Sequence, residues 1–370
     1  MSDADNLIYN RFDIIFPDSY GEFSITRDKD IYRIQFAIDE EGRASLNVWG
    51  RKLPTDVFED AVEYVFDKLN IKEIWINSSR NNYKGQLVKY GDVKILIPDD
   101  WGELQGRLGK KGRYNLNRER RRIKGLFEGF DVLHEHIIIS NNTVWKYFEW
   151  KMTTHGTDYH MSPEQYLKTY HVTDALRLVG DGRDIAILFY CMCEGTAYLE
   201  NFSYDVEYRK YSPGFVIYTY FLEKMVRDGC TSIFLGKSGL SYKERFGSVV
   251  NECFEGTIYR TDVFQHINEY LMQRNLKSIA IYGMGKCGRE FLQISKYLDI
   301  DIMFVIDQVK QKIDMFNVYT PDELKTVKDI DLIIICMERR SINVENRIVQ
   351  WKCKYLYFNE LMDIGRSKTE

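Results

Sequence analysis

The sequence is poor in the features that mark disulfide-rich, zinc-binding, membrane-spanning and disordered proteins. Its seven cysteines are scattered and form no C-x-x-C pair, which excludes a disulfide framework and a zinc site and fits reduced thiols. Only six prolines argue against long disordered segments. No apolar run approaches the roughly 20 residues that a membrane-spanning helix needs. The first residues are acidic and lack the regions of a signal peptide, so we expect a cytoplasmic protein without a metal.

Net charge is also small, because 51 Lys and Arg face 55 Asp and Glu, which leaves −4. This balance gives no general attraction to nucleic acid or to anionic membranes. With 370 residues, 44% of them hydrophobic, the chain has room for two or three domains with sizeable cores.

The most informative stretch runs through residues 196–247. A strand is predicted at Thr196–Tyr204, and a helix begins after Ser212, a good N-cap, with Pro213 at its first position. Apolar residues then recur at helical spacing to Arg227, and a short strand follows at Ser232–Leu235. A strand that enters a helix in this way points backbone N–H groups at one spot, which suits a pyrophosphate. The same pattern also fits a plain strand-helix-strand crossover without a ligand.

Five short motifs in this stretch closely resemble the GNAT acyltransferase subfamily that includes cellulose-biosynthesis-associated acetyltransferases. They are Tyr204-Asp205, Tyr211-Ser212-Pro213-Gly214, Asp228-Gly229, Gly236-Lys237-Ser238-Gly239 and Tyr242-Lys243. The resemblance implies acyl-coenzyme A as the donor. It places the coenzyme against Asn201, Tyr211, Ser212, Pro213, Gly214, Lys237, Ser238 and Lys243.

A basic segment, residues 107–124, carries nine Lys and Arg residues. If it is helical, Lys110, Arg113 and Arg121 share one face, while Leu116 and Ile123 face the core. Three interpretations of this basic face are open: it is exposed to solvent, it binds nucleic acid, or it binds an anionic substrate. It resembles the basic helix of the Fem peptidyltransferases, which are built from two GNAT-like halves. That resemblance implies substrate binding by Lys110, Lys111, Arg113, Tyr114 and Asn115.

Acyl transfer to an amine needs a held thioester, a neutral amine and a donor for the tetrahedral oxyanion. Glu200 and Asn201 lie mid-strand and should point to opposite faces of the sheet. Glu200 would accept the amine proton or position the amine. The alternative is that Glu200 is a half-exposed carboxylate on the sheet without a catalytic role. By resemblance, Tyr242 protonates the leaving thiolate; a surface helix is the alternative. Asp92 and Glu119 are further acidic candidates that would orient an ammonium group.

The last third changes pattern. A short strand at Lys277–Tyr282 precedes Gly283, Gly285 and Gly288 in G-x-G-x-x-G spacing, and Asp307 follows 24 positions after Gly283. The segment resembles the small Rossmann-like nucleotide-sugar domain of some sugar acetyltransferases. It is predicted to bind a nucleotide or to be purely structural, with half of the doubly wound fold missing.

We therefore predict an α/β protein with tandem GNAT-like halves, 1–135 on the acceptor side and 136–262 on the acyl-CoA side, and a Rossmann-like domain at 263–370. Residues 1–99 read mainly as strands, beginning at residues 13–16, with one helix at 54–69.

The resemblances suggest an N-acyltransferase that acts on a nucleotide-linked amino sugar, such as dTDP-4-amino-4,6-dideoxyglucose in the anthrose pathways of bacterial surface glycans. The alternatives are a Fem-like transferase that uses aminoacyl-tRNA, and a nucleotide-sugar-binding protein without catalysis.

Overall fold

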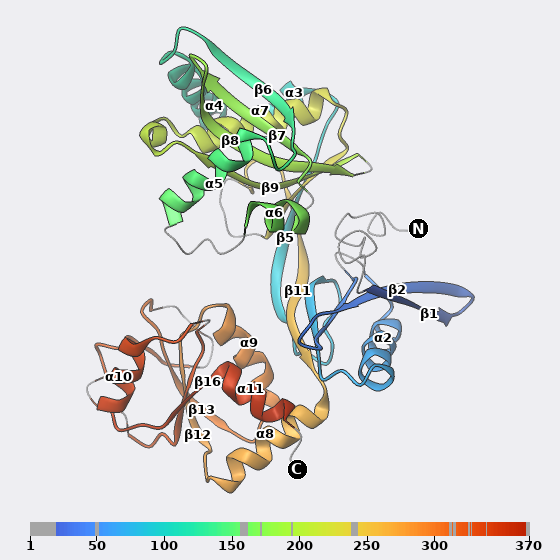
Figure 1. The fold of residues 1–370 in the computed structure, drawn as a ribbon, viewed down its shortest axis with the longest axis vertical. Coiled ribbons are helices and arrows are strands. Elements are labelled where there is room, and N and C mark those ends of the chain that lie inside the picture. The colour runs from blue at the N-terminus through green and yellow to red at the C-terminus, as the bar shows by residue number, and fades with distance from the viewer. Residues whose placement is uncertain are drawn as a thin grey trace. The chain divides into compact units, whose positions relative to one another are not determined.

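The computed structural model describes residues 20–48, 52–155, 162–170, 172–193, 195–237, 243–310, 313, 316–324, 326, 328–337 and 339–367. The predicted strand at residues 13–16 and the candidate residues Ser238 and Tyr242 lie outside these ranges. The described chain divides into two compact units (Figure 1). One holds residues 90–253, and the other holds the described parts of residues 16–89 and 254–370.

The first unit is a mixed sheet with helices on both faces. Its strands follow the order β5-β10-β9-β8-β7-β6. Their bounds are β5 Val88–Leu96, β6 Phe130–His136, β7 Asp174–Gly180, β8 Arg183–Cys193, β9 Thr196–Tyr204 and β10 Ser232–Lys237, with β11 (Val249–Tyr259) shared between the units. The helices are α3 Trp101–Gly106, α4 Lys110–Lys124, α5 Asn142–His155, α6 Pro163–Thr169, the 3₁₀ helix η3 Val206–Tyr211, and α7 Pro213–Arg227.

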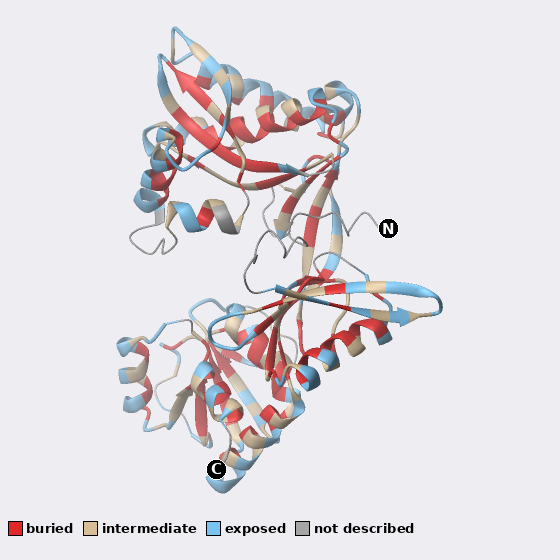
Figure 2. Cartoon of the chain, turned by 45° about the vertical axis from the view of Figure 1, so that its right-hand side comes forward, coloured by how far each residue is buried: buried red, intermediate tan, exposed pale blue. Residues whose placement is uncertain are grey.

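Alternation along the strands assigns these helices to two faces, as the buried segments in Figure 2 illustrate. Leu176 and Leu188 point to a core shared with α3, α4 and α7. Their neighbours Ala175, Ile187 and Phe189 point to a second core shared with α5 and α6. Because both faces are buried, β8 reads as one long apolar run rather than as alternating polar and apolar residues.

The N-terminal part of the second unit packs one helix on a sheet of order β1-β2-β3-β4-β11. Its elements are β1 Tyr20–Arg27, β2 Asp30–Ile38, β3 Ala44–Leu46, α2 Thr55–Lys68 and β4 Glu73–Ser79. Val57, Ala61 and Val65 recur on one face of α2 and are buried. They meet Ile74 and Ile258, so this face of the sheet is apolar and the other face is left for polar side chains.

The C-terminal part of the second unit is a parallel sheet of order β14-β13-β12-β15-β16. Its elements are α8 Thr261–Gln273, β12 Ser278–Tyr282, α9 Lys286–Ile294, the 3₁₀ helix η4 Ser295–Tyr297, β13 Asp301–Ile306, β14 Val318–Tyr319, β15 Leu332–Ile335, α10 Ile342–Gln350, β16 Tyr355–Tyr357 and α11 Phe358–Arg366. One face packs on α8, α9 and α11 and the other on α10, as expected for a parallel sheet.

The predicted fold class is confirmed as a mixed α/β protein with a separate five-stranded parallel sheet near the C-terminus. That sheet is fuller than predicted, because the two-residue β14 and three-residue β16 extend it to five of the six strands of the doubly wound order. The boundaries after residues 135 and 262 stay predictions, since compact units need not coincide with domains. No described helix combines the length and the apolar character needed to cross a bilayer.

Candidate active site

Strands β9 and β10 separate at the centre of the first unit. They run parallel and pair at three positions, from Thr196–Ser232 to Tyr198–Phe234. Beyond Tyr198 no further pair between them is described, although β9 continues to Tyr204 and β10 to Lys237. The described pairing between β9 and β10 therefore ends at Tyr198, and the two strands form no further ladder within the described residues.

A β-bulge lies in the same part of β9. Leu199 opposes Tyr190 of β8 and Asn201 opposes Phe189, so Glu200 is the extra residue. A bulge interrupts strict alternation and re-aims side chains. Both Glu200 and Asn201 accordingly interact with the α5–α6 side: Glu200 acts on Tyr170 through its charge, and Asn201 bonds to α5. The bulge interrupts the alternation from which opposite orientations were predicted, and the orientation of Glu200 stays a prediction.

Lys151 of α5 is the residue that sequence reasoning missed. Its Nζ donates to Asn201 Oδ1 at 3.0 Å, and its ammonium lies 5.6 Å from the ring centre of Tyr147. The residue is only 7% exposed. Burial lowers the pKa of Lys151 to about 8, so a minority of the side chain is already neutral near physiological pH. A buried lysine with a lowered pKa beside a bulged strand is a candidate proton acceptor.

The start of α7 lies next to this group. Ser212 precedes the helix in the left-handed conformation (φ 55°, ψ 47°), Pro213 occupies the first position, and no side chain caps the helix. A Cβ on Gly214 would lie 2.6 Å from the Phe202 ring of β9, so only glycine allows this approach. The N–H of Phe202 in turn donates to Asn201 Oδ1 at 2.8 Å, which ties the helix start to the bulge.

Cations and aromatic rings surround the first turn of α7. The Lys210 ammonium and the Arg122 guanidinium lie 5.1 and 5.5 Å from the ring centre of Tyr211. The Arg245 guanidinium lies 5.9 Å from the ring of Phe215. Uncapped amides at a helix start, with three cations nearby, suit an anion such as a diphosphate. Motif reasoning identified Tyr211 to Gly214 but not these cations, because they come from η3, α4 and a later turn.

Glu119 and Asp92 are buried and serve neighbouring side chains. Glu119 accepts hydrogen bonds from Arg118 at 2.6 Å and from Arg122 at 3.0 Å, so it orients Arg122. Asp92 accepts from the Cys253 thiol at 3.2 Å. Both carboxylates therefore have structural partners in this structure, and a catalytic role for them remains a prediction.

Lys243 and Lys237 lie at the end of β10. Lys243 Nζ donates to the backbone oxygens of Leu235 at 2.6 Å and Lys237 at 3.0 Å. Burial lowers the pKa of Lys243, and the charge of Asp92 opposes that shift. Lys237 lies over Tyr90 at 5.2 Å. Lys243 thus holds the strand end where β10 leaves β9, and a phosphate would have to compete with two carbonyls.

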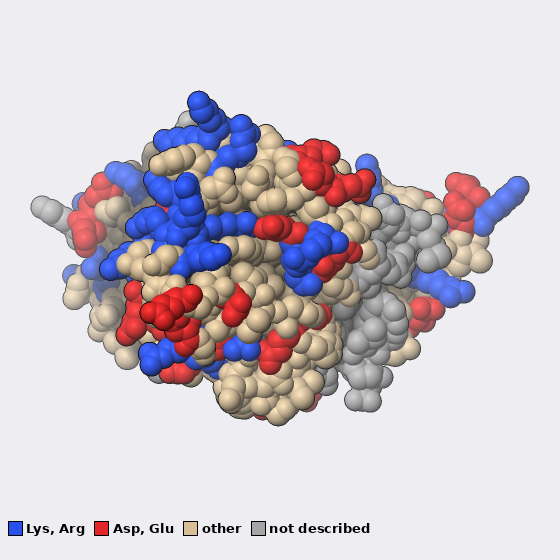
Figure 3. Space-filling view, turned by 90° about the horizontal axis from the view of Figure 1, so that it is seen from above, with Lys and Arg blue, Asp and Glu red and all other residues tan. Residues whose placement is uncertain are grey.

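The predicted acceptor clamp lies on α4, whose polar face is strongly basic. Exposed Lys and Arg on this helix are Lys110, Lys111, Arg113, Arg118, Arg121, Arg122 and Lys124. Lys and Arg side chains also gather in one region of the view in Figure 3. Arg113 Nη1 donates to the Leu108 oxygen at 2.6 Å, and Arg121 Nε donates to the Asn117 oxygen at 3.2 Å. Tyr114 is exposed under Arg118, and Asn115 is partly buried.

In the second unit, the glycine turn has the geometry of a dinucleotide-type loop. A Cβ on Gly288 would lie 2.1 Å from the Gly283 oxygen, so helix α9 packs directly on the turn, whereas Gly285 faces open space. Asp307 accepts from the Met284 N–H at 2.6 Å and from Val309 at 2.9 Å. The four predicted residues are therefore brought together, with Asp307 bonded to the loop itself.

A comparison with protein families identifies the segment with the bulge and the helix start. Residues 110–244 match the model described as an acetyltransferase (GNAT) domain. This segment is a GNAT acyltransferase domain. The protein is therefore an acyltransferase enzyme of the N-acyltransferase kind, and GNAT domains typically use acyl-CoA. Within the described ranges, no group of three or more His, Cys, Asp or Glu is arranged to hold a metal ion.

Solved structures similar to this chain include FemX, with 9% identity over 68% of this chain and 92% of that chain and a TM-score of 0.48. A tandem GNAT protein from the clavulanic acid biosynthesis pathway has 12% identity, 65% and 84% coverage, and a TM-score of 0.40. A GCN5-related N-acetyltransferase from Sphaerobacter thermophilus has 9% identity, 64% and 79% coverage, and 0.37. With TM-scores below 0.5, these likenesses carry no functional weight. Among curated protein sequences, none matches the chain.

Proposed function

We propose that the protein transfers an acyl group from acyl-coenzyme A to the amino group of a nucleotide-linked deoxyamino sugar. The observation that carries the proposal is the start of α7. Its amides have no side-chain cap, and Lys210, Arg122 and Arg245 lie around it. Coenzyme A carries a diphosphate, the group that such amides and cations suit.

The reaction would take place beside the bulge of β9. When bound, acyl-CoA supplies a thioester, whose carbonyl carbon the amine nitrogen attacks. A backbone N–H of β9 next to the point where its pairing with β10 ends would donate to the oxyanion that forms. Lys151 in its neutral form, or the carboxylate of Glu200, would take the proton that the amine loses. The carbon–sulfur bond then breaks, and the thiolate takes up one proton, which balances the one lost by the amine, and leaves as the free thiol.

The acceptor is proposed from the charge of α4 and from the second unit. Lys110 and Lys111 are exposed on α4 and suit the diphosphate of a nucleotide sugar. The glycine turn at residues 283–288, with Asp307, suits a nucleotide. We propose dTDP-4-amino-4,6-dideoxyglucose, in the synthesis of a surface glycan, as the acceptor to test first.

The test is turnover by RNase-treated protein with acetyl-CoA and this amino sugar nucleotide. We expect one free thiol and one N-acetylated sugar for each turnover, measured by thiol titration and mass spectrometry. If calorimetry shows no binding of coenzyme A, the donor assignment is wrong. If coenzyme A binds but a panel of nucleotide-linked amino sugars gives no product, the acceptor assignment is wrong.

A second candidate is transfer from an aminoacyl-tRNA, as in the Fem-like alternative. The observation that favours it is the row of seven exposed cations on α4, since such a surface binds polyanions. Under this candidate, activity requires charged tRNA and disappears after RNase treatment. A protein that only senses nucleotide sugars would instead bind the nucleotide and show no affinity for coenzyme A.

A further inference from the structure

The second unit contains a polar cavity on the outer face of its N-terminal sheet. Ile74, Ile76 and Ile258 fill the apolar face under α2, so the residues between them point the other way. Ser45, Trp75 and Thr257 are paired in one row across β3, β4 and β11, and Glu73 is paired with Tyr259 in the next. These side chains line a cavity of about 410 Å³, which Glu290 of α9 and Arg366 and Asn359 of α11 complete.

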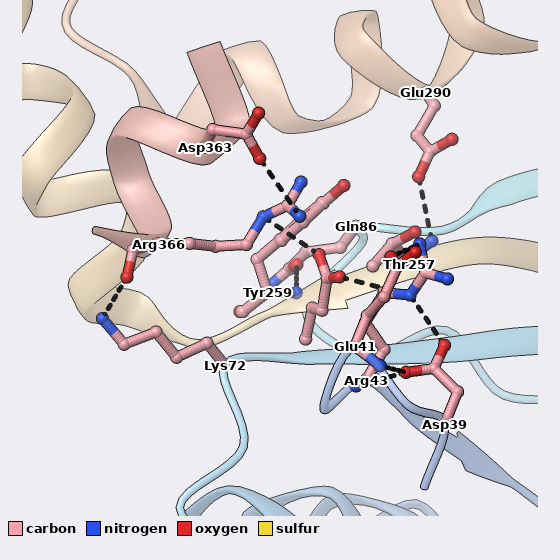
Figure 4. A network of polar contacts seen from close by, with 11 residues as sticks. Asp39, Glu41, Arg43, Lys72, Gln86, Thr257, Tyr259, Glu290, Asp363 and Arg366 are labelled. Carbon is pink, nitrogen blue, oxygen red and sulfur yellow. Dashed lines mark hydrogen bonds and ion pairs between the residues drawn. The ribbon is translucent and has the colours of Figure 1, made fainter. Parts of the chain in front are cut away.

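Glu73 is the central group of this cavity, and its bonding is incomplete. The residue is 5% exposed, and burial raises the pKa of its carboxyl against the opposing effect of two arginines. Its carboxylate oxygens lie 3.4 Å from Arg366 Nε and 3.9 Å from Arg43 Nε, which are ion-pair distances longer than a good hydrogen bond. Arg366 Nε is itself buried without a hydrogen-bond acceptor. Figure 4 shows these arginines approaching from α11 and from the β2–β3 turn.

Glu290 offers a second acceptor on the opposite wall. Its Oε1 accepts the Thr257 N–H at 3.0 Å, which fixes the side chain (Figure 4). The Thr257 side chain also bonds to the Glu290 carboxyl. Buried carboxylates with few donors are costly, so Glu73 in particular gains from a ligand that donates hydrogen bonds.

The charges around the cavity argue against a cationic ligand. Asp39, Glu73 and Glu290 are matched by Arg43, Arg366 and Lys286. The Lys286 ammonium already lies 4.4 Å from the ring centre of Trp75, in the place that a ligand cation would take. A neutral ligand with hydroxyl groups, which both donate and accept, fits Glu73 and Arg366 together.

We propose that this cavity binds a neutral polyhydroxyl ligand, a pyranose sugar, which lies beside Trp75 and shares its hydroxyls between Glu73, Glu290 and Arg366. The cavity has the volume of small-ligand pockets, roughly 300 to 1,000 Å³, and the same mixture of an aromatic wall and few polar groups. The sugar is either free or the sugar end of a nucleotide sugar. The site lies in the second unit, so it does not depend on the acyl-transfer site of the first.

The test is saturation-transfer NMR and calorimetry on the full chain with D-glucose, N-acetylglucosamine, D-glucosamine and dTDP-glucose. We expect the neutral sugars to bind, and binding to weaken at least tenfold in Glu290→Gln and Trp75→Leu. Asn359→Ala, an exposed change that the fold tolerates, should weaken binding several-fold. Trp351→Phe and Glu323→Gln, which lie outside the cavity, are the matched controls.

Each outcome decides the proposal. Binding of dTDP-glucose without glucose supports the nucleotide-linked source, and binding of both with similar affinity supports the free sugar. Binding of glucosamine alone overturns the neutral ligand. No saturation transfer from any of the four, or equal binding by all variants, overturns the site. Binding of coenzyme A is measured in parallel, so failure here is distinguishable from failure of the proposed donor.

Discussion

At the scale of single residues, Lys151 is a buried lysine of the first unit whose electrostatic cost can be tested by mutation. Its ammonium is buried against Tyr147, with Asn201 Oδ1 as its hydrogen-bond acceptor. Lowering a lysine pKa from 10.5 to about 8 corresponds to about 3 kcal/mol of destabilisation of the charged form. A stable protein tolerates such a residue for function rather than for folding.

We therefore expect Lys151→Met to raise the free energy of unfolding at pH 7 by up to about 3 kcal/mol. The folded state binds fewer protons than the unfolded state between pH 8 and 10.5. The wild-type protein should therefore gain stability as pH rises through this window, and the variant should not. Urea unfolding at pH 7 to 10.5 measures both effects. Lys146→Met on the exposed side of α5 is the control, and an unchanged pH profile in Lys151→Met would contradict the shift.

The same residue makes a prediction about rate. If neutral Lys151 takes the amine proton, kcat/KM for the acceptor rises with pH through about 8. Lys151→Arg keeps the charge and the size, so it should lose most activity and lose this rise. Glu200→Gln separates the two candidates: if Lys151 is the acceptor, this variant keeps the rise near pH 8, and if Glu200 is the acceptor, it loses most activity. A rise that survives Lys151→Arg assigns the proton acceptor elsewhere.

Single residues of this site were predictable only where local sequence decides them. Glu200, Asn201 and Gly214 were identified from their places in a strand and a motif. Lys151 was not, because a lysine in an amphipathic helix has no local sign of burial. The bulge at Glu200 was missed for a similar reason, since it depends on the register with β8.

At the scale of elements, the start of α7 makes a sharp prediction. Gly214→Asp is a poor probe, because its Cβ would collide with the Phe202 ring. Ser212→Asp is better: the residue is exposed, and aspartate tolerates the left-handed conformation that Ser212 adopts. The new carboxylate would cap the amides and favour the helix dipole, which is worth about 0.5 to 1 kcal/mol.

We expect Ser212→Asp to weaken coenzyme A binding at least tenfold while thermal stability stays equal or rises. Calorimetry and thermal unfolding of the same samples measure the two effects. Ser212→Asn has the same shape without the charge and should retain binding. Unchanged affinity in Ser212→Asp would show that the diphosphate binds elsewhere.

The basic helix α4 gives a further prediction. Lys110→Ala with Lys111→Ala should raise KM for the nucleotide sugar several-fold and leave KM for acyl-CoA nearly unchanged, because both lysines lie outside the cluster at α7. Arg113 is unsuitable for this test, since its guanidinium bonds to the Leu108 oxygen. Arg122→Gln should instead raise KM for acyl-CoA and leave KM for the nucleotide sugar nearly unchanged. Equal effects of the double change on both substrates would count against a separate clamp.

Helices and strands were predicted well where a regular pattern of apolar residues extends over many positions. They were missed where a strand has only two or three residues. The strand Thr196–Tyr204 and the helix that follows Ser212 lie as predicted, as does the glycine turn before α9. The strands β14 and β16 have two and three residues, too few for a pattern, and exist only through pairing with β13 and β15.

At the scale of the whole molecule, the chain passes between its two compact units inside strands β5 and β11. Analysis of the sequence in chain order did not predict that one compact unit is built from two separate parts of the chain, because it assigned each continuous stretch to one domain. It did foresee the mixed α/β class and the separate parallel sheet. What it lacked was knowledge of which strands pair across long separations in the chain.

Two ligand sites in two compact units lead to the last prediction. A ligand at one hundred times its Kd stabilises the state that binds it by about 2.7 kcal/mol. Hydrogen exchange with coenzyme A should therefore slow in residues 199–219, around β9 and the start of α7. Exchange with a neutral sugar should slow in β4 and in the first turns of α9 and α11, which line the cavity.

The two protection patterns should stay separate, because each ligand contacts side chains of one unit only. Ser212→Asp should abolish the first pattern and keep the second, and Glu290→Gln should do the opposite. Each variant serves as the control for the other, because each should remove protection by one ligand and retain protection by the other under the same conditions. If coenzyme A protected α9 and α11 but not α7, the assignment of the donor to the GNAT domain's helix start would be wrong, whatever the turnover assay had shown.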